Sequence, residues 1–380
     1  MGVQDQTQEK FRCVYMRGGT SKAVFFHKED LPVDEGKWDE IFLKVEGSPD
    51  VKQIDGMGGT VSSTSKIAVI SKSQRPDADV DFTFLQVAVD EPTVIHNVGC
   101  GNIGSAVGSY SIDEGLVPAK GDDEVTKVRI YNTNTKKYLE NWVRTKDGHA
   151  RIYGDCTIQG VPGTGSRVDE FFLDPAGSVT GKLFPTGHGK DMITLEDGRK
   201  FPVTIIDSGN LVVILQAESL GLTGTEQQEL NGNQKVMDVL EELRGRAAAQ
   251  IGLVSDWREA KKVTPAAPDL AIVSHPKDYS ILDGGKVKRE DLDLCCRAVT
   301  MGKVHKAYPV TVGIATGSAA VLAGTVVNDI VGPQEKETVI RLGHASGIME
   351  VTVINDGNQI QKAGVVRTAR RIMDGFVYIR

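Results

Sequence analysis

The chain has 380 residues, more than one hydrophobic core usually serves, so its length predicts two domains. Hydrophobic residues make up 40% and charged residues 25%, a balance that excludes a globally disordered chain. The formal net charge is -7 and no long basic run occurs, which excludes a broad basic surface for nucleic acid.

The N-terminal segment 1–6 lacks the basic and apolar regions of a secretory signal, and no stretch approaches the roughly 20 apolar residues that cross a bilayer. The cysteines are odd in number and lack the paired spacing of a metal site, which fits reduced thiols. They are Cys13, Cys100, Cys156, Cys295 and Cys296. We therefore expect a cytoplasmic protein with no membrane segment and no bound metal.

Short runs of apolar residues, alternating with polar ones or briefly continuous, predict mainly β-strands. The predicted strands cover 11–16, 66–71, 80–89, 125–131, 203–206, 211–215 and 270–274. Helical patterns are fewer, and we predict helices over 102–113, 234–251, 289–300 and part of 311–327. In the third helix we expect at least one of Cys295 and Cys296 to pack as a small apolar residue.

The segment 16–22, Met-Arg-Gly-Gly-Thr-Ser-Lys, places a Gly-Gly turn, two hydroxyls and two cations between strands. Backbone N–H groups in such a turn form a concavity for a carboxylate or phosphate, and an arginine binds a carboxylate through two hydrogen bonds. A plain hairpin turn with solvated charges is the alternative. The spacing of a nucleotide-binding phosphate loop is absent. The candidate anion-binding residues here are Arg17, Gly19, Thr20, Ser21 and Lys22.

A second loop rich in glycine and hydroxyl residues covers 55–66 and leads into an apolar strand. Its last residues are Ser65 and Lys66. Burial of Lys66 near other cations would favour its neutral amine, which accepts protons. The alternative is a surface lysine whose alkyl chain packs along the protein. Two similar loops in one chain favour a shared site over two unrelated turns.

The turn 97–102, Asn-Val-Gly-Cys-Gly-Asn, follows a strand that ends near Ile95 and precedes a predicted helix. We therefore expect Cys100 at a helix N-terminus, where free N–H groups and the helix dipole stabilise a thiolate and bind carboxylates. The glycines of the turn give a substrate access to the backbone, so Gly101 and Asn102 are candidate binding residues. A buried structural cysteine in a tight turn is an equally open interpretation.

A glycine-dotted stretch at 175–189 marks the expected boundary between two domains, 1–187 and 188–380. Each half holds one segment rich in Gly, Ala and Ser, at 101–108 and at 315–324. Helices of this composition allow neighbouring backbone to come close on every side, so we expect each helix to be buried inside a curved sheet.

In the second half, Asn210 lies in a turn between two predicted strands and is either a carboxylate ligand or a turn-holding residue. His305 and His344 are set among small or basic residues. A single histidine is more often structural or exposed, so neither indicates a site by itself.

Taken together and in order, these motifs resemble the PrpF family over essentially the whole chain. The matching segments are 16–22, 58–66, 100–102 with the helix that follows, 207–210, 301–307, 324–328 and 343–347. The resemblance implies an α+β, diaminopimelate-epimerase-like fold with two pseudo-symmetric lobes. Each lobe would be a curved, mostly antiparallel sheet around a central helix, with the active site in the cleft between the lobes.

The resemblance also implies roles for single residues. Lys66 and Cys100 would form the acid–base pair, with carboxylates held by Ser21, Asn102, Asn210 and Ser346 among others. Two departures from the family pattern bear on substrate shape: Gly99 stands where members usually have Asn, and Ala345 where they have Pro. The second cysteine of the epimerases has no evident counterpart. Ser318 is the nearest small polar residue in the second central helix, so racemisation by two thiols is not expected.

From this resemblance we expect a cofactor-independent isomerase that moves or isomerises a C=C bond in an unsaturated tricarboxylate by allylic proton transfer. The reactions it favours are those of an aconitate delta-isomerase, a cis- to trans-aconitate isomerase or a 2-methylaconitate isomerase. A 4-oxalomesaconate tautomerase and a methylitaconate isomerase stay open as alternatives. So do an amino-acid epimerase, which would need a second thiol, and a noncatalytic tricarboxylate-binding accessory protein of an aconitase-like enzyme. We expect a small di- or tricarboxylate as partner, with no nucleic acid and no membrane; a homodimer is left open.

Overall fold

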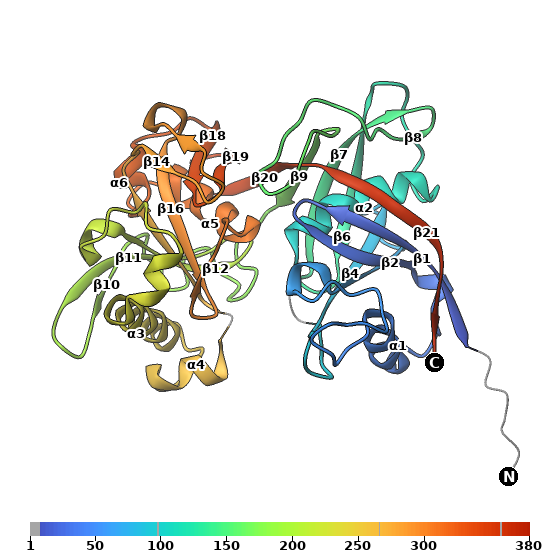
Figure 1. Cartoon of the computed structure of the whole chain (residues 1–380). Coiled ribbons are helices and arrows are strands. Elements are labelled where there is room, and N and C mark those ends of the chain that lie inside the picture. Colours follow the sequence, from blue (N-terminus) through green and yellow to red (C-terminus); the bar gives the residue numbers. More distant parts are fainter. Residues whose placement is uncertain (1–7, 97–98, 266, 358) are drawn as a thin grey trace, which may run out of the picture. The chain divides into compact units, whose positions relative to one another are not determined.

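β-Strands are the dominant regular structure of the computed structural model, which describes residues 8–380 except 97–98, 266 and 358 (Figure 1). Contacts between Cα atoms divide the chain into two units. The first unit holds 1–170 and 366–380, and the second holds 171–365. The C-terminal segment therefore belongs with the first unit, and 171–187 with the second. The boundary at 187/188 in the sequence analysis assigned both segments to the opposite domains.

The first unit contains helices α1 (Trp38–Glu46) and α2 (Gly101–Asp113). Its strands are β1 (Glu9–Gly18), β2 (Ser21–His27), β3 (Lys66–Lys72), β4 (Val80–Val87), β5 (Val94–Ile95), β6 (Val125–Asn132), β7 (Lys137–Lys146), β8 (His149–Ala150), the first half of β9 (Val168–Leu173) and β21 (Ala369–Ile379). β1 pairs antiparallel with β2 and β21. β2 then runs parallel to β3, β3 pairs antiparallel with β4, β4 runs parallel to β6, and β6 pairs antiparallel with β7.

The second unit contains helices α3 (Gln234–Gln250), α4 (Ala260–Val263), α5 (Val310–Val321) and α6 (Asn328–Val331). Its strands are β10 (Asp191–Thr194), β11 (Lys200–Asp207), β12 (Leu211–Gln216), β13 (Asp269–Ser274), β14 (Tyr279–Ser280), β15 (Lys286–Val287), β16 (Leu294–Thr300), β17 (Lys303–Val304), β18 (Glu337–His344), β19 (Gly347–Asn355) and most of β20 (Ile360–Arg367). β11 pairs antiparallel with β12, β12 runs parallel to β13, and β13 pairs antiparallel with β16. β16 runs parallel to β18, which pairs antiparallel with β19.

The two units repeat one strand order. The hairpin β1–β2 corresponds to β11–β12, and the pairs β2–β3, β3–β4, β4–β6 and β6–β7 correspond to β12–β13, β13–β16, β16–β18 and β18–β19, with the same directions. A long buried helix enters at the same point of each series, α2 before β6 and α5 before β18. The expected arrangement, mostly antiparallel strands around a central helix, is confirmed in each unit.

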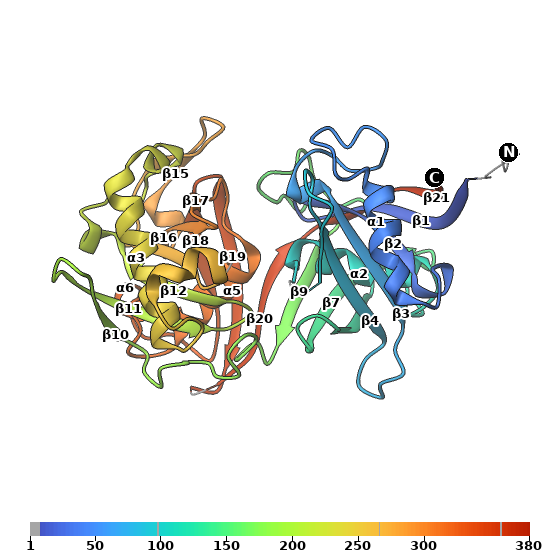
Figure 2. The same cartoon turned by 90° about the horizontal axis from the view of Figure 1, so that it is seen from below.

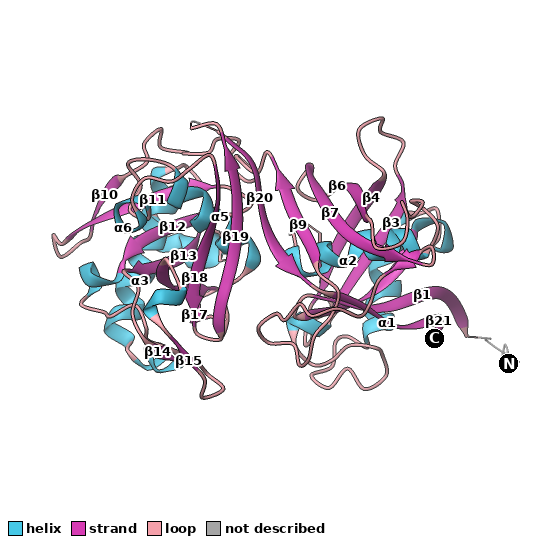
Figure 3. Cartoon of the chain, turned by 90° about the horizontal axis from the view of Figure 1, so that it is seen from above, coloured by secondary structure: helices cyan, strands magenta, loops and turns pink. Residues whose placement is uncertain are grey.

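Small residues let the central helices lie against the strands that enclose them (Figure 1, Figure 3). A methyl group on Gly108 would lie 2.7 Å from Cβ of Asn141 on β7, and one on Gly317 would lie 2.6 Å from a side-chain carbon of Val351 on β19. Since β7 and β19 are corresponding strands, the two helices use glycine for the same close approach.

Each sheet buries both faces. In the first unit Phe25 of β2 packs on Tyr110 of α2 with ring centroids 5.3 Å apart. The next residue, Phe26, packs on Phe42 of α1 with centroids 5.7 Å apart. Because successive strand residues point to opposite faces, α1 and α2 cover opposite sides of this sheet (Figure 2). In the second unit α5 and α3 cover the two faces in the same way.

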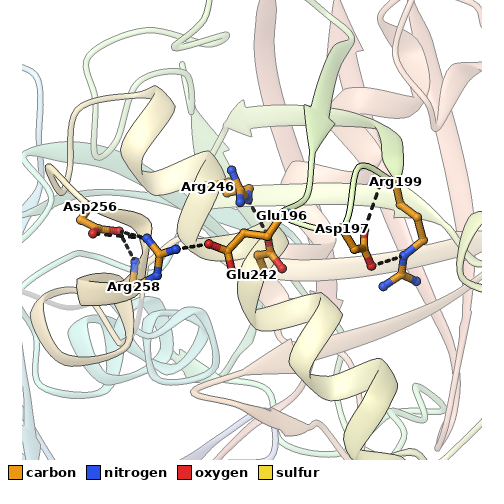
Figure 4. Close-up of polar contacts among 7 residues, drawn as sticks. All are labelled: Glu196, Asp197, Arg199, Glu242, Arg246, Asp256 and Arg258. Carbon is orange, nitrogen blue, oxygen red and sulfur yellow. Dashed lines mark hydrogen bonds and ion pairs between the residues drawn. The ribbon is translucent and has the colours of Figure 1, made fainter.

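A polar network joins α3 to the turn between β10 and β11 (Figure 4). The Glu242 carboxylate accepts hydrogen bonds from Arg246 Nε at 2.6 Å and from the Glu196 backbone N–H at 2.7 Å. Arg258 pairs with the Glu196 side chain and lies 4.8 Å from the ring centroid of Trp257. The network joins α3, the turn between β10 and β11 and the segment that holds Arg258, and it includes none of the predicted site residues.

The predicted strands all coincide with observed strands, and three of the four predicted helices coincide with α2, α3 and α5. The helix predicted over 289–300 is wrong, because Arg289–Asp291 form one 3-10 turn and Leu294–Thr300 form strand β16. Residues on both faces of β16 belong to hydrophobic cores, so its sequence is apolar apart from the buried Arg297 and lacks the alternation of a half-exposed strand. Cys295 and Cys296 are fully buried, as expected of small apolar residues, but on a strand.

Candidate active site

The turn between β1 and β2 packs directly on the start of α2. Gly19 has a φ of +49°, and a methyl group on it would lie 2.1 Å from Oδ1 of Asn102. Nδ2 of Asn102 donates to the Thr20 hydroxyl at 3.1 Å, and Oδ1 accepts from the Thr20 backbone N–H at 3.4 Å. The fold thus brings together two segments that are 82 residues apart in the sequence.

Cys100 is the N-cap residue of α2, as its sequence position predicted, with a free and partly exposed thiol. Its carbonyl accepts the Gly104 N–H at 2.9 Å, while its side chain makes no capping hydrogen bond. The first turn therefore keeps backbone N–H groups, and the positive end of the helix dipole, for another negative group. Asn97 and Val98 of the same turn lie outside the described residues.

Lys66 is the first residue of β3, and its exposed fraction is only 7%. Its Nζ donates to Oε1 of Gln86 at 2.5 Å and lies 5.0 Å from the ring centroid of Phe84. In the parallel pairing of β2 and β3, Val24 lies opposite Ile67. Lys66 therefore lies level with the residue between Lys22 and Val24. Among the residues that the structure describes, no carboxylate lies within ion-pair distance of the Lys66 ammonium.

Ser65 is fully buried and already engaged by the protein. Its hydroxyl donates to the Val87 carbonyl at 3.0 Å and accepts from Nε2 of Gln53 at 2.7 Å. The same Gln53 amide accepts the Thr60 N–H at 2.8 Å and donates to Ser48 at 3.1 Å. Gln53 therefore ties the loop before Lys66 together, a role that no local motif indicates.

Arg17 and Lys22 make contacts that differ from direct anion binding. The Arg17 guanidinium donates to the Gly19 carbonyl at 2.9 Å and to the carbonyl and hydroxyl of Thr368 at 2.8 and 3.0 Å. Burial lowers the pKa of Arg17. Its contacts hold the turn rather than leave the guanidinium open. Lys22 follows Ser21 in β2, so the two side chains point to opposite faces of the sheet. Nζ of Lys22 lies 5.3 Å from the ring centroid of Tyr15, on the face that α1 covers.

Two buried carboxyls lie close to these elements and are absent from the residues chosen from the sequence. Burial raises the pKa of Glu46, the last residue of α1, to about 8. Burial also raises the pKa of Glu170 to about 8, against the attraction of Arg367. A methyl group on Gly104 of α2 would lie 2.4 Å from Oε1 of Glu170. A signal for Glu46 exists, because it shares a helix face with Ile41, Phe42 and Val45.

In the second unit Asn210 is held by two neighbours. Its Nδ2 donates to Oδ2 of Asp269 at 2.8 Å, and its Oδ1 accepts the Leu211 N–H at 2.9 Å. Burial raises the pKa of Asp269 to about 7, partly offset by the hydrogen bond from Asn210. Asn210 therefore holds its turn in this structure, which is one of the two roles considered for it.

The other candidates of the second unit form one cluster. The Ser346 hydroxyl donates to the Lys306 carbonyl at 2.5 Å, and its N–H donates to Nδ1 of His344 at 3.2 Å. His344 is almost fully buried. Nδ1 of His305 accepts the Ala307 N–H at 3.0 Å, and burial lowers the pKa of His305. His305, His344 and Ser346 thus lie together near the N-terminus of α5.

The repeat locates the second-unit counterpart of Cys100. Pro309 is the N-cap of α5, as Cys100 is of α2, and Gly313 follows it at the spacing of Gly104. Ser318 lies deep in α5, fully buried, with its hydroxyl 2.8 Å from that of Ser208. Proline therefore replaces the second thiol, and Ser318 is not its counterpart.

No helix in the described part of the chain is long and apolar enough to cross a membrane. Within the same residues, no three side chains of His, Cys, Asp or Glu gather as a metal site requires.

The chain is similar over nearly its whole length to one protein family and to several isomerases. A family model described as PrpF protein matches residues 8–380. The chain is 41% identical over 374 residues to 3-methylitaconate isomerase from Eubacterium barkeri, covering 98% of each chain. It is 39% identical over 388 residues to 2-methyl-aconitate isomerase from Shewanella oneidensis, covering 98% of this chain and 97% of the relative. It is 36% identical to (4E)-oxalomesaconate Delta-isomerase from Novosphingobium sp. over the full length of both.

Solved structures agree on the fold. A crystal structure of methylitaconate-delta-isomerase superposes with a TM-score of 0.91 at 41% identity, covering 98% of this chain and 96% of the other. A hydroxyproline epimerase from Agrobacterium vitis has a TM-score of 0.54 at 12% identity, covering 97% of this chain and 92% of the other. The second likeness concerns the fold alone, and it agrees with the epimerase-like architecture expected from the sequence.

Proposed function

The chain belongs to the PrpF family and is an isomerase, and we propose that it moves or isomerises the C=C bond of an aconitate-type unsaturated tricarboxylate. Relatives that are 36–41% identical carry the names of three different substrates. Identity at this level therefore selects the reaction class rather than the substrate. Aconitate and 2-methylaconitate are our first candidates, and oxalomesaconate and methylitaconate are the alternatives.

The proposed reaction is an allylic proton transfer. The neutral amine of Lys66 takes a proton from the carbon next to the double bond, and the electron pair left behind spreads through the double bond into a carboxylate. The Cys100 thiol then gives a proton to the carbon two positions away, so the double bond has moved and no atom is gained or lost. Proton transfer from the Lys66 ammonium to the Cys100 thiolate restores both groups. Rotation in the intermediate before reprotonation would instead give a cis–trans product.

The observation that carries this proposal is the presence, within one unit, of a thiol at a helix N-terminus and of a nearly buried lysine with no ion-paired carboxylate among the described residues. A charged lysine is costly to bury without a counter-ion. The N–H groups at the start of α2 stabilise negative charge that develops on a substrate carboxylate. Thr20 and Asn102 add hydroxyl and amide groups at the same end of the helix.

The second unit has Pro309 at the helix position that Cys100 occupies in the first unit. Racemisation would need a second thiol, so this difference supports double-bond migration. The noncatalytic alternative differs in one measurable respect. An accessory protein would bind a tricarboxylate without exchanging its protons with solvent.

Exchange of substrate protons with deuterated solvent tests the assignment. We expect Lys66→Ala and Cys100→Ser each to lose exchange and turnover by about 100-fold or more, the usual contribution of a general acid or base. Cys156→Ser, which changes another partly exposed thiol of the same unit, is the matched control. Near wild-type exchange and turnover in both site variants would show that the assignment is wrong. Proton NMR on aconitate, methylaconitate, itaconate and oxalomesaconate identifies the substrate.

A further inference from the structure

Gln86 of β4 lies directly opposite Lys66 of β3 in the antiparallel pairing of these strands. Residues that face each other across two antiparallel strands project to the same side of the sheet. Phe84, two residues before Gln86, projects to that side as well, and its ring centroid lies 5.0 Å from Nζ of Lys66. Gln86 and Phe84 are therefore the two β4 side chains beside the Lys66 amine.

The side of the sheet to which Lys66 points is the one that α2 covers. Ala68 shares a face with Lys66 and lies opposite Phe25 of β2. The Phe25 ring packs in turn on Tyr110 of α2. The Lys66 side chain thus lies on the same side of the sheet as the helix that begins after Cys100.

The neighbours of the Gln86 amide fix its orientation. Its Nε2 donates to the backbone carbonyls of Ser65, Ser62 and Val87 at 2.8, 3.1 and 3.3 Å. An amide oxygen in this place would face three acceptors, so the nitrogen must occupy it. Oε1 is therefore the atom that faces Lys66, and it accepts a hydrogen bond from Nζ at 2.5 Å.

A neutral amide oxygen suits a lysine that has to give up its proton. It accepts a hydrogen bond from the ammonium and from the neutral amine alike, because both carry N–H groups. A carboxylate in its place would form an ion pair and favour the charged ammonium. When the neutral amine of Lys66 donates one hydrogen to Oε1, its lone pair points away from Gln86.

Several ionisable groups lie on the elements around the start of β3. They are Glu46 on α1, Lys22 on β2, Cys100 and Tyr110 on α2, and His96 after β5. Among the residues that the structure describes, Gln86 is the one side chain that hydrogen-bonds Nζ of Lys66. The other groups are the same in every Gln86 variant, so a change in the Lys66 titration reports its contact with Gln86.

We propose that Gln86 positions Lys66 for proton transfer, because it fixes the place of Nζ and directs the lone pair away from β4 without supplying a negative charge. This inference rests on the proposed function, in which Lys66 is the base. Gln86 acts through Lys66 and makes no contact with the substrate.

Two substitutions should move the titration of Lys66 in opposite directions. Gln86→Glu places a carboxylate beside the ammonium and should raise the midpoint by about one pH unit or more. Gln86→Met keeps the length of the side chain but removes the acceptor, and it should lower the midpoint because the ammonium loses a hydrogen bond that favours it.

Carbon NMR of protein labelled at the lysine Cε atoms follows these midpoints without substrate, and Lys66→Ala identifies the resonance. Gln74→Glu adds the same charge on the exposed turn between β3 and β4 and should leave the midpoint unchanged. Each variant has its own expected sign, so either one suffices if the other does not fold. An unchanged midpoint, or a shift of the opposite sign, overturns the inference.

The pH profiles of kcat and kcat/KM, with the substrate that the NMR panel identifies, give the second readout. Gln86→Met should lower kcat by about 10-fold or more with KM near the wild-type value, because the amine is misplaced while the carboxylate-binding groups are intact. Gln86→Glu should move the rising limb upward with its NMR midpoint. Gln74→Met should keep the wild-type profile.

The two readouts separate this inference from the proposed function. A loss of activity that is equal at all pH values, with unmoved NMR midpoints, is the result of a purely structural role and overturns the inference alone. NMR midpoints that move as expected while the rising limb stays in place would show that Lys66 is not the base. The proposed function would then fail, and the positioning role with it, although the contact between Lys66 and Gln86 would stand.

Discussion

Gly19 is the residue through which the first hairpin reaches the central helix. Its positive φ suits glycine, and its α-carbon faces the Asn102 side chain with no room for a further atom. The hydroxyl of the next residue, Thr20, depends on this approach for its hydrogen bond with Asn102. Thus one glycine sets the distance between two parts of the candidate site.

Gly19→Ala should lower both stability and activity. Alanine at this φ is strained by about 1 kcal/mol, and its methyl group also displaces Asn102, so we expect a total loss of about 1–3 kcal/mol in the free energy of unfolding. Gly148→Ala is the control, because Gly148 has a φ of +80° and no atom within 4 Å of an added methyl group. Urea unfolding and kcat/KM compare the two. Equal losses of stability, with kcat/KM intact in both variants, would contradict a role for the Asn102 contact.

At the scale of elements, the segment between α1 and β3 is organised by Gln53 rather than by regular structure. Its buried amide connects Ser48, Thr60 and Ser65, and the last of these precedes Lys66. Loss of the amide removes one of the two hydrogen bonds of the buried Ser65 hydroxyl and leaves the N–H of the exposed Thr60 to water. A buried polar group that loses its partner costs about 1–3 kcal/mol.

We therefore expect Gln53→Met, which keeps the length of the side chain and removes its polar atoms, to destabilise the protein by about 1–3 kcal/mol. Activity of the folded fraction should also fall, because the start of β3 loses its support. Gln74→Met, on the exposed turn between β3 and β4, should leave both quantities near wild type. A stable Gln53→Met protein with unchanged kcat would show that the amide does not position Lys66.

The sequence was informative where local chemistry decides the structure. Cys100 between glycines predicted a helix start, and the Gly-Gly turn before Thr20 predicted a hairpin; both are observed. It was misleading at Cys295 and Cys296, because a strand buried on both faces has the same apolar run as a buried helix. It gave no sign of Gln53, whose partners come from loop closure. Glu46 was detectable only after α1 had been recognised, and that helix was not predicted.

At the scale of the whole molecule, two units of one topology carry different chemistry. The first has Cys100 at the start of its central helix and the buried Glu46 at the end of α1, while the second has Pro309 at the matching helix position. The second unit contains its own buried acid, Asp269, at the start of β13. The strand order thus repeats while the candidate reactive groups do not, which agrees with the proposal that both proton-transfer groups, Lys66 and Cys100, come from one unit.

Asp269 makes the stability of the protein depend on pH. Burial raises the pKa of Asp269 from 3.8 to about 7, so between these values the folded protein holds a proton that the unfolded chain has released. Stability from this group is therefore full below pH 4 and is lost as pH rises to 7, at up to about 1.4 kcal/mol per pH unit. Asp269→Asn keeps an oxygen that accepts the hydrogen bond from Asn210 and removes the ionisable carboxyl. The free energy of unfolding of this variant should therefore fall less than that of the wild type between pH 5 and pH 8. Asp238→Asn, at an exposed position on α3, is the control and should retain the wild-type slope. Urea unfolding at each pH gives the slopes, and parallel curves for the wild type and Asp269→Asn would mean that Asp269 is ionised in the folded protein throughout this range.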